Sequence, residues 1–155
     1  MMISKKLANL GDRRRYIGGS DARVIMGEDE GALLRLWREK RGEEEPADLS
    51  DNLVVQLGVA TETLNRLWYE RNTGNAIGQV QRQVRHAVNR WMGATLDGMV
   101  EATGAVFEAK FMLPWSFSEE AAAGKHMAQL QHNMWVVNAR EAALSIITRS
   151  EEHTS

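Results

Sequence analysis

ATLDG at residues 94–98 and FEAKF at residues 107–111 are the two runs that decide the fold of this chain. Each run predicts a β-strand, and alternation along the second strand points Glu108 and Lys110 to the same side. An Asp97 and a Glu108 on neighbouring strands can hold a divalent metal ion between them. Two carboxylates, a metal and a lysine form a site suited to phosphodiester hydrolysis. Asp-Gly is also a favoured hairpin turn, so a purely structural reading of Asp97 stays open at this point.

The amino-acid composition limits the classes of protein to which this chain can belong. A chain of 155 residues with 43% hydrophobic and 26% charged residues is typical of one globular domain with its own core. It has no cysteine, which excludes disulfides, thiolate zinc sites and a cysteine nucleophile, and we expect a cytoplasmic location. The first residues lack the apolar run of a signal peptide, and no stretch is long enough to span a bilayer, so we expect no membrane partner.

The net charge of the chain indicates which kinds of nucleic-acid-binding protein it can be. A formal net charge of −2 is unlike that of a protein that coats DNA. It is compatible with a nuclease, because acidic metal ligands offset a local basic groove. A local basic cluster does occur at residues 13–15, directly before the Gly18-Gly19 turn.

Hydrophobic periodicity and turn residues predict the elements. We expect a short helix from an N-cap at Ser20 to Gly27, and an apolar face of Leu33, Leu34 and Trp37 on the next helix. The other expected elements are helices at 31–41, 51–73 and 119–139, and strands at 80–87, 91–100, 105–111 and 142–148.

This order predicts an α/β fold in which the first three strands form an antiparallel meander. The last strand follows a helical crossover, so it should run parallel to a neighbour in a mixed sheet with helices on both sides. We expect two apolar helix stripes, on 51–73 and on 119–139. We also expect four tryptophans in the core, Trp37, Trp68, Trp91 and Trp135, and Trp115 near a DNA groove.

Several sequence motifs occur in order between about Arg13 and Val137. They are the run from Arg13 to Ser20 within RRRYIGGSD, GVATE at 58–62, TLDG at 95–98, EAK at 108–110 and MAQLQHNMWV at 127–136. They resemble the motifs of the PD-(D/E)XK nuclease superfamily and, within it, of the YqaJ viral recombinase family, the group of phage lambda exonuclease. The resemblance implies a restriction-endonuclease-like core with the order α-β-β-β-α-β.

The resemblance also implies a role for each matched residue. Asp97, Glu108 and the carbonyl of Ala109 would bind Mg²⁺, with Mn²⁺ as a substitute. Lys110 would orient the attacking water and stabilise the transition state, Glu62 would reach the metal region from its helix, and Gln129 would position the water or the scissile phosphate. A pocket for a 5′-phosphate would be formed by Arg13, Ser20 and Thr95.

The sequence departs from the family pattern in two places. Thr95-Leu96 stands where the family has Ser-Pro, although the threonine keeps a hydroxyl. The adjacent arginines 13–15 leave open which one faces the phosphate. A structural reading also stays open for Glu62, which can pair with Arg66 one helical turn later.

The resemblance implies a Mg²⁺-dependent 5′→3′ exonuclease that acts on double-stranded DNA ends in phage-type recombination. Such a protein would be encoded by a bacterial host or by a phage. The alternatives are an endonuclease or nickase on the same core, and a catalytically impaired DNA-binding fragment. The implied partners are a single-strand annealing protein and a homotrimer. We expect one nuclease domain at 1–148, clipped at its C-terminal end, and a non-native tail at 149–155 that reads like a translated sequencing adapter.

Overall fold

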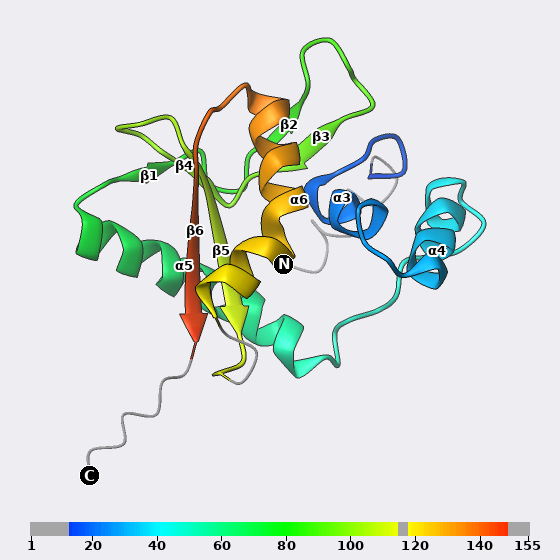
Figure 1. Ribbon diagram of the computed structural model, residues 1–155, viewed down its shortest axis with the longest axis horizontal. Coiled ribbons are helices and arrows are strands. Elements are labelled where there is room, and N and C mark those ends of the chain that lie inside the picture. The colour runs from blue at the N-terminus through cyan, green and yellow to red at the C-terminus, as the bar shows by residue number, and fades with distance from the viewer. Residues whose placement is uncertain (1–12, 115–117, 149–155) are drawn as a thin grey trace.

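The computed structural model describes residues 13–114 and 118–148 (Figure 1). The expected tail at 149–155 and Trp115 lie outside the described residues. The helices are α3 (Gly19–Ile25), α4 (Glu30–Lys40), α5 (Leu53–Thr73) and α6 (Glu119–Val137). The strands are β1 (Ile77–Gly78), β2 (Gln83–Arg85), β3 (Gly93–Thr95), β4 (Gly98–Val100), β5 (Val106–Met112) and β6 (Ala142–Thr148).

In the described part of the chain, the main sheet has four strands in the order β1-β4-β5-β6. β4 is antiparallel to β1 and β5, and β6 is parallel to β5, with Val106 opposite Ala142. The predicted order α-β-β-β-α-β is therefore confirmed by α5, β1, β4, β5, α6 and β6. The helices α5 and α6 cover opposite faces of this sheet, as predicted (Figure 1).

The predicted strand at 80–87 is wrong in its bounds and its partner. Gln79 and Gln81 have positive φ angles of 51° and 58°, which interrupt an extended strand. The chain becomes extended only at β2, which pairs with β3 in a separate two-stranded sheet in the described part of the chain. The predicted meander is therefore built from β1, β4 and β5 instead.

The predicted strand at 91–100 is two strands, and Asp97 lies between them. The chain leaves the small sheet after Thr95, buries Leu96 completely, and enters the main sheet at Gly98. Gly98 pairs with Phe107, and a Cβ at Gly98 would collide with the side chain of Ile77 on β1. The Asp-Gly pair is thus no hairpin tip; the turn before β5 is at Thr103-Gly104, as predicted.

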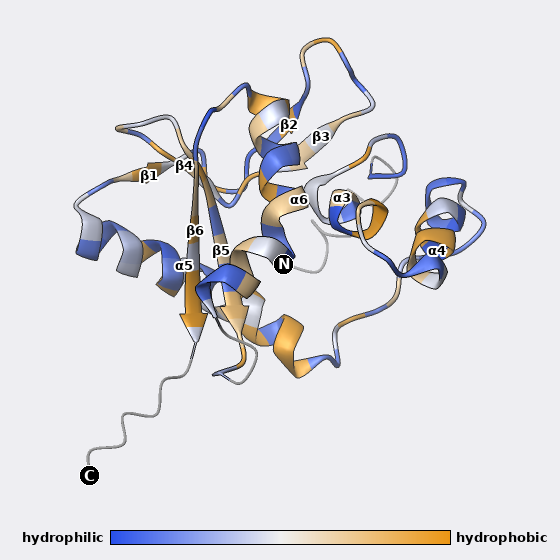
Figure 2. Ribbon diagram, in the orientation of Figure 1, coloured by the Kyte–Doolittle hydropathy of each residue, from blue (hydrophilic) through white to orange (hydrophobic). Residues whose placement is uncertain are grey.

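Side chains on β5 alternate between two hydrophobic clusters of the described residues. Phe107 joins Ile77 and Val100 on the α5 side, where its ring lies 5.1 Å from that of Tyr69. Val106 joins the cluster on the α6 side, which contains Ala94, Leu96 and Val136. This alternation, with apolar β5 and β6 in the middle of the molecule, puts Glu108 and Lys110 on the α6 side (Figure 2).

The ends of two helices can be compared with the ends that the sequence predicts. α3 begins at Gly19 after an N-cap at Gly18, so Ser20 is no N-cap. Its first turn is stabilised by Asp21, whose carboxylate accepts the N–H of Gly18 at 2.8 Å. α5 ends at Gly74, as predicted, because this residue has the left-handed φ of 73° that glycine tolerates.

The predicted apolar faces of α4 and α5 are largely exposed, and the four tryptophans expected in the core are exposed as well. On α4 the buried residue is Leu36, while Leu33, Leu34 and Trp37 are exposed. On α5 the described buried residue is Asn65, which donates to Ser145 O at 2.9 Å. The exposed apolar residues of α5 include Leu53, Leu64, Leu67 and Trp68.

Candidate active site

Asp97 and Glu108 face each other where β4 and β5 meet. The register pairs Gly98 with Phe107, so one further step along the two strands places Asp97 opposite Glu108. The Oδ2 of Asp97 accepts the backbone N–H of Ala109 at 2.8 Å. This bond fixes the aspartate against β5, although Asp97 is outside a strand.

Glu108 is held from two further sides. Its Oε1 accepts a hydrogen bond from Nε2 of Gln129 on α6 at 3.0 Å and lies 2.8 Å from the ammonium of Lys110. The side chain is 2% exposed. Its second oxygen, Oε2, is buried without a hydrogen-bond partner among the described residues, so it keeps capacity for a cation or a donor.

The charge state of the two acids follows from their burial. Burial, with the negative charge of Asp97 as the second cause, raises the pKa of Glu108 to about 7. Burial also raises the pKa of Asp97, against the opposing effects of the Ala109 N–H and Lys110. Two buried carboxylates that disfavour each other's charge form a pair that a cation would stabilise.

Glu62 belongs to the same neighbourhood. Burial raises its pKa, and the next cause is the negative charge of Asp97. Its Oε1 accepts a hydrogen bond from Gln81. The side chain of Asn65, one turn later on α5, bonds to the carbonyls of Lys110 and Ser145 and so fixes the helix that carries Glu62 against the sheet. The structure therefore brings Glu62 to the acids, and Arg66 only contributes a smaller charge effect.

These residues fit a hard divalent cation. Such ions take oxygen ligands, and the centre offers the carboxylates of Asp97 and Glu108. The carbonyl of Ala109 points to the same edge of β5 as its N–H, which faces Asp97. Among the described residues no three His, Asp or Glu side chains are arranged as a metal-binding cluster, so the ligands of such an ion would be the two acids and the main chain.

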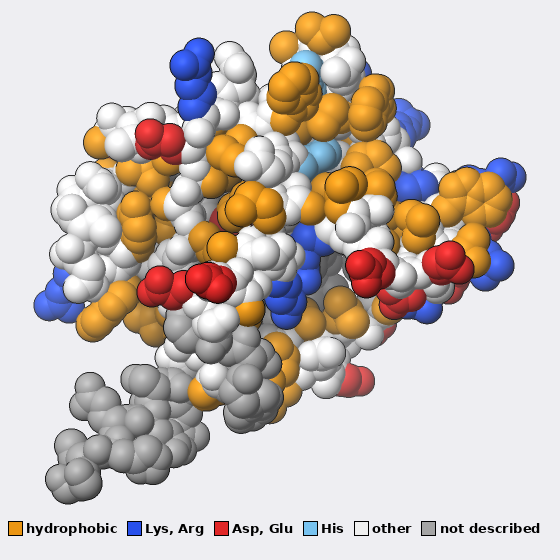
Figure 3. Space-filling model, in the orientation of Figure 1, with side chains coloured by type: hydrophobic (Ala, Val, Ile, Leu, Met, Phe, Trp, Pro, Cys, Tyr) orange, Lys and Arg blue, Asp and Glu red, His pale blue; other side chains and the backbone are white. Residues whose placement is uncertain are grey.

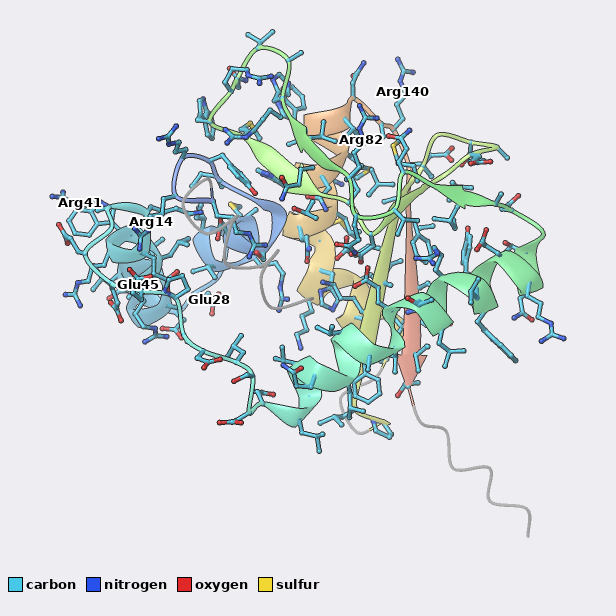
Figure 4. The ribbon with its side chains drawn as sticks, turned by 180° about the vertical axis from the view of Figure 1, so that it is seen from behind. Arg14, Glu28, Arg41, Glu45, Arg82 and Arg140 are labelled. Atoms are coloured by element: carbon cyan, nitrogen blue, oxygen red, sulfur yellow. The ribbon has the colours of Figure 1, made fainter. Side chains whose placement is uncertain are left out.

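A cavity of about 260 Å³ is connected to the two acids through residues of its lining, although neither acid lines it. Arg13, Ser20 and Thr95, which sequence motifs suggested as a phosphate pocket, all line it, and so does Gln129. Arg14 also lines it but pairs with Glu45 at 2.6 Å (Figure 4), whereas Arg15 is not among the lining residues. The cavity therefore favours Arg13 among the three arginines.

The cavity has a framework that sequence reasoning missed. The ammonium of Lys40 donates to the carbonyls of Arg13 and Tyr16 at 2.6 and 2.8 Å, and it lies 2.8 Å from Asp21. This lysine ties α4 to the turn that carries Arg13 and to the start of α3. No sequence motif marks it, because its partners are two backbone carbonyls and a carboxylate from a distant segment.

α6 turns a polar stripe toward the site. His126, Gln129 and Asn133 are buried at a spacing of three and four residues, and the same spacing in the sequence could have identified them. Asn133 and Gln129 leave no room for a Cβ at Gly19, so α3 packs closely on α6 at this point. In the apolar stripe predicted on this helix, which is Met127, Leu130, Met134 and Val137, Leu130 is buried and Met127 is exposed.

The burial of His126 in this stripe can be tested through its pKa. Both its ring nitrogens lack a hydrogen-bond partner among the described residues. Burial, followed by the charges of Lys110, Arg23 and Lys125, lowers its pKa from 6.5 to about 4. Between pH 6.5 and pH 4, His126 is therefore protonated in the unfolded chain but neutral in the folded chain. The free energy of unfolding should fall as the pH falls from 6.5 toward 4.

We expect His126→Gln to remove this contribution. The melting temperature of the wild type should fall more steeply than that of His126→Gln when the pH is lowered through this range. Thermal unfolding followed by circular dichroism at several pH values measures the difference. Parallel pH profiles for the two proteins would show that His126 is not buried in its neutral form.

The sequence profile of the YqaJ-like viral recombinase domain matches residues 9–140. The chain belongs to this family. A relative in Bacillus subtilis (strain 168), described as "Uncharacterized protein YqaJ", is 26% identical over 130 residues, which cover 81% of this chain and 40% of the relative. The chain therefore spans less than half the length of that family member.

Solved structures of other proteins share the fold of this chain. An alkaline exonuclease (LHK-Exo) from Laribacter hongkongensis superposes with a TM-score of 0.72 at 19% identity, over 90% of this chain and 72% of that chain. Its complex with dAMP gives 0.68 at 19% identity, over 92% and 73%. A phage related exonuclease from Haemophilus somnus 129PT gives 0.68 at 17% identity, over 86% and 68%. This chain therefore shares the fold of these exonucleases. None of the helices in the described residues could span a membrane.

Proposed function

We propose that this chain carries the catalytic core of a divalent-metal-dependent deoxyribonuclease that degrades duplex DNA from 5′-phosphorylated ends. The observation that carries this proposal is that two residues of the cavity are directly connected to the acids. Thr95 and Gln129 line the cavity, Thr95 lies two residues before Asp97, and Gln129 donates to Glu108. A phosphate in the cavity would thus lie beside the carboxylates.

The cavity residues suit a terminal phosphate. Arg13 offers a planar fork of donors that matches phosphate oxygens, and the hydroxyls of Ser20 and Thr95 add directional donors. The terminal phosphate would set how far the DNA end enters, so that the first phosphodiester reaches the acids.

The residues around Glu108 suit hydrolysis of that phosphodiester. A divalent cation held by Asp97, Glu108 and Ala109 would lower the pKa of a water molecule and neutralise charge on the phosphate. Lys110 would place its ammonium where negative charge builds up in the transition state. Gln129, whose Oε1 has no partner among the described residues, would accept a hydrogen bond from the attacking water.

The relatives support the same reaction class. The Laribacter protein is described as an alkaline exonuclease and has been crystallised with dAMP. A nucleoside monophosphate is what an exonuclease releases from DNA. On the family resemblance alone we also propose Mg²⁺ as the cation, with Mn²⁺ as its substitute, and a homotrimer and a single-strand annealing protein as partners.

The experiment uses end-labelled linear duplex and closed circular duplex, with Mg²⁺ or with chelator. We expect degradation of the linear DNA only, and only with Mg²⁺. Rapid cutting of closed circles would instead favour an endonuclease or nickase on the same core. No cleavage of either DNA would contradict both enzyme readings.

The 5′-phosphate gives a sharper test. We expect duplex with 5′-phosphate ends to be degraded at least several-fold faster than duplex with 5′-hydroxyl ends, because hydrogen bonds from a charged group are worth about 1.5–3 kcal/mol. Arg13→Ala should remove most of this preference. The matched control is Arg15→Ala, because Arg15 is exposed and does not line the cavity. Equal rates of the wild type on both substrates would contradict the phosphate pocket.

A further inference from the structure

A second hollow lies at the C-terminal end of α6, beside the β2–β3 hairpin. It measures about 600 Å³, and we call it the Trp135 groove. Hydrophobic side chains gather at this end of the molecule with a histidine among them (Figure 3). The groove is lined by Gln79, Arg82, Val84, Arg85, His86 and Trp135, together with the last residues of α6.

The groove contains an exposed aromatic platform. Trp135 is 61% exposed, so the described residues leave much of this large apolar ring uncovered. The imidazole of His86 lies nearly parallel to it, with an angle of 7° and a centroid distance of 6.0 Å. The N–H groups of Val88 and Asn89 donate to Nδ1 of His86 at 3.2 and 2.8 Å and hold that ring in place. The indole therefore has a fixed aromatic neighbour, and more than half of the residue is exposed.

The charge around this platform is positive. Arg82 and Arg85 line the groove, and none of the described residues that line it is acidic. Arg140 lies at the same end of the molecule as Arg82 (Figure 4) and lines a smaller hollow that shares Trp135. In a chain with a net charge of −2, this is a local excess of positive charge. The ligand that it fits is an anion with flat apolar groups.

One side-chain contact joins the wall of the groove to the wall of the cavity that Arg13 lines. Tyr16 lines the cavity, and the guanidinium of Arg85, which lines the groove, lies 4.1 Å from the centre of the Tyr16 ring. Arg85 therefore connects a residue of the cavity to the groove that contains Trp135. This contact between the two walls is the reason to link the groove to the DNA whose end the cavity would receive.

We propose that the Trp135 groove binds a single-stranded segment of DNA, with one base stacked on the indole of Trp135 and its phosphates near Arg82 and Arg85. The proposal rests on the proposed function, because degradation of one strand at a duplex end leaves the other strand unpaired. Bases in a duplex are stacked on each other and cannot cover the indole, whereas an unpaired base has a free face. The alternative ligand of the groove is an acidic or apolar peptide. Such a peptide would not stack a base on the indole of Trp135.

The test is binding of a short oligo(dT) in the presence of chelator, measured by fluorescence anisotropy of a labelled oligonucleotide. We expect Trp135→Ala to weaken binding about tenfold, since one base–aromatic stack contributes that much or more. The matched control is Trp68→Ala, because Trp68 is 58% exposed on α5 at a site away from the groove. An oligonucleotide of the same length with abasic sites should bind the wild type more weakly and should not distinguish it from Trp135→Ala.

Each outcome decides a different claim. Equal affinity of the wild type and Trp135→Ala for oligo(dT) would overturn the proposal and leave a protein segment as the occupant of the groove. Equal weakening by Trp135→Ala and Trp68→Ala would overturn it too, because the effect would then be general. Trp135-dependent binding in a protein that cuts no DNA with Mg²⁺ would contradict the proposed function and leave the binding groove standing.

Discussion

Glu108→Gln should abolish DNA cleavage, with a loss of about three orders of magnitude or more, and leave the fold intact. The variant loses an anionic oxygen from a site in which two carboxylates would hold the metal. The amide can keep its Oε1 toward Lys110 and Gln129 and put its Nε2 where Oε2 has no partner among the described residues. Cleavage of linear duplex under saturating Mg²⁺ measures the loss.

The same variant should be at least as stable as the wild type when metal is removed. The fold raises the pKa of Glu108 from 4.5 to about 7, so the wild type loses stability as pH rises through this range and the carboxyl ionises. The amide cannot ionise, so the advantage of Glu108→Gln should grow from pH 4.5 to pH 7. Melting temperatures with chelator at several pH values measure this difference.

Asp97→Asn should behave in the same way, because burial also raises the pKa of Asp97. The matched control is Glu101→Gln, since Glu101 is an exposed acid on the turn that follows β4. This control should cleave DNA like the wild type. Near-wild-type cleavage by Glu108→Gln or Asp97→Asn would show that the metal centre lies elsewhere.

Lys110→Ala should slow cleavage by about 10²-fold or more and change DNA affinity much less. The ammonium lies 2.8 Å from Glu108, and in our proposal it acts on charge that develops only in the transition state. Single-turnover cleavage of pre-bound DNA measures the chemical step, and anisotropy with chelator measures affinity.

The control for this lysine is Lys125→Ala, because Lys125 is an exposed lysine on α6. It should affect neither the chemical step nor, by more than a few-fold, the affinity. A fall in the affinity of Lys110→Ala with unchanged turnover of bound DNA would make Lys110 a contact to the DNA backbone and not part of the reaction.

The sequence by itself determined the family, the order of the main elements and the candidate acids. These follow from local features: Glu108 and Lys110 share a face because side chains alternate along a strand, and Gly74 ends α5 because glycine tolerates a left-handed φ. The parallel pairing of β6 with β5 was also predictable, since a helical crossover reverses the chain twice.

Only the tertiary structure decided where Asp97 lies and which side chains are buried. The break at Asp97 depends on Leu96 filling one hydrophobic cluster and on Ile77 approaching Gly98 from β1, and both are contacts between distant segments. Burial of the helices depended on their neighbours in the same way. Apolar periodicity marked a face of α5 that stays exposed, whereas Asn65 is buried because β5 and β6 supply its hydrogen-bond partners. A periodic pattern gives the face of a helix, but the packing of the other elements decides which face is covered.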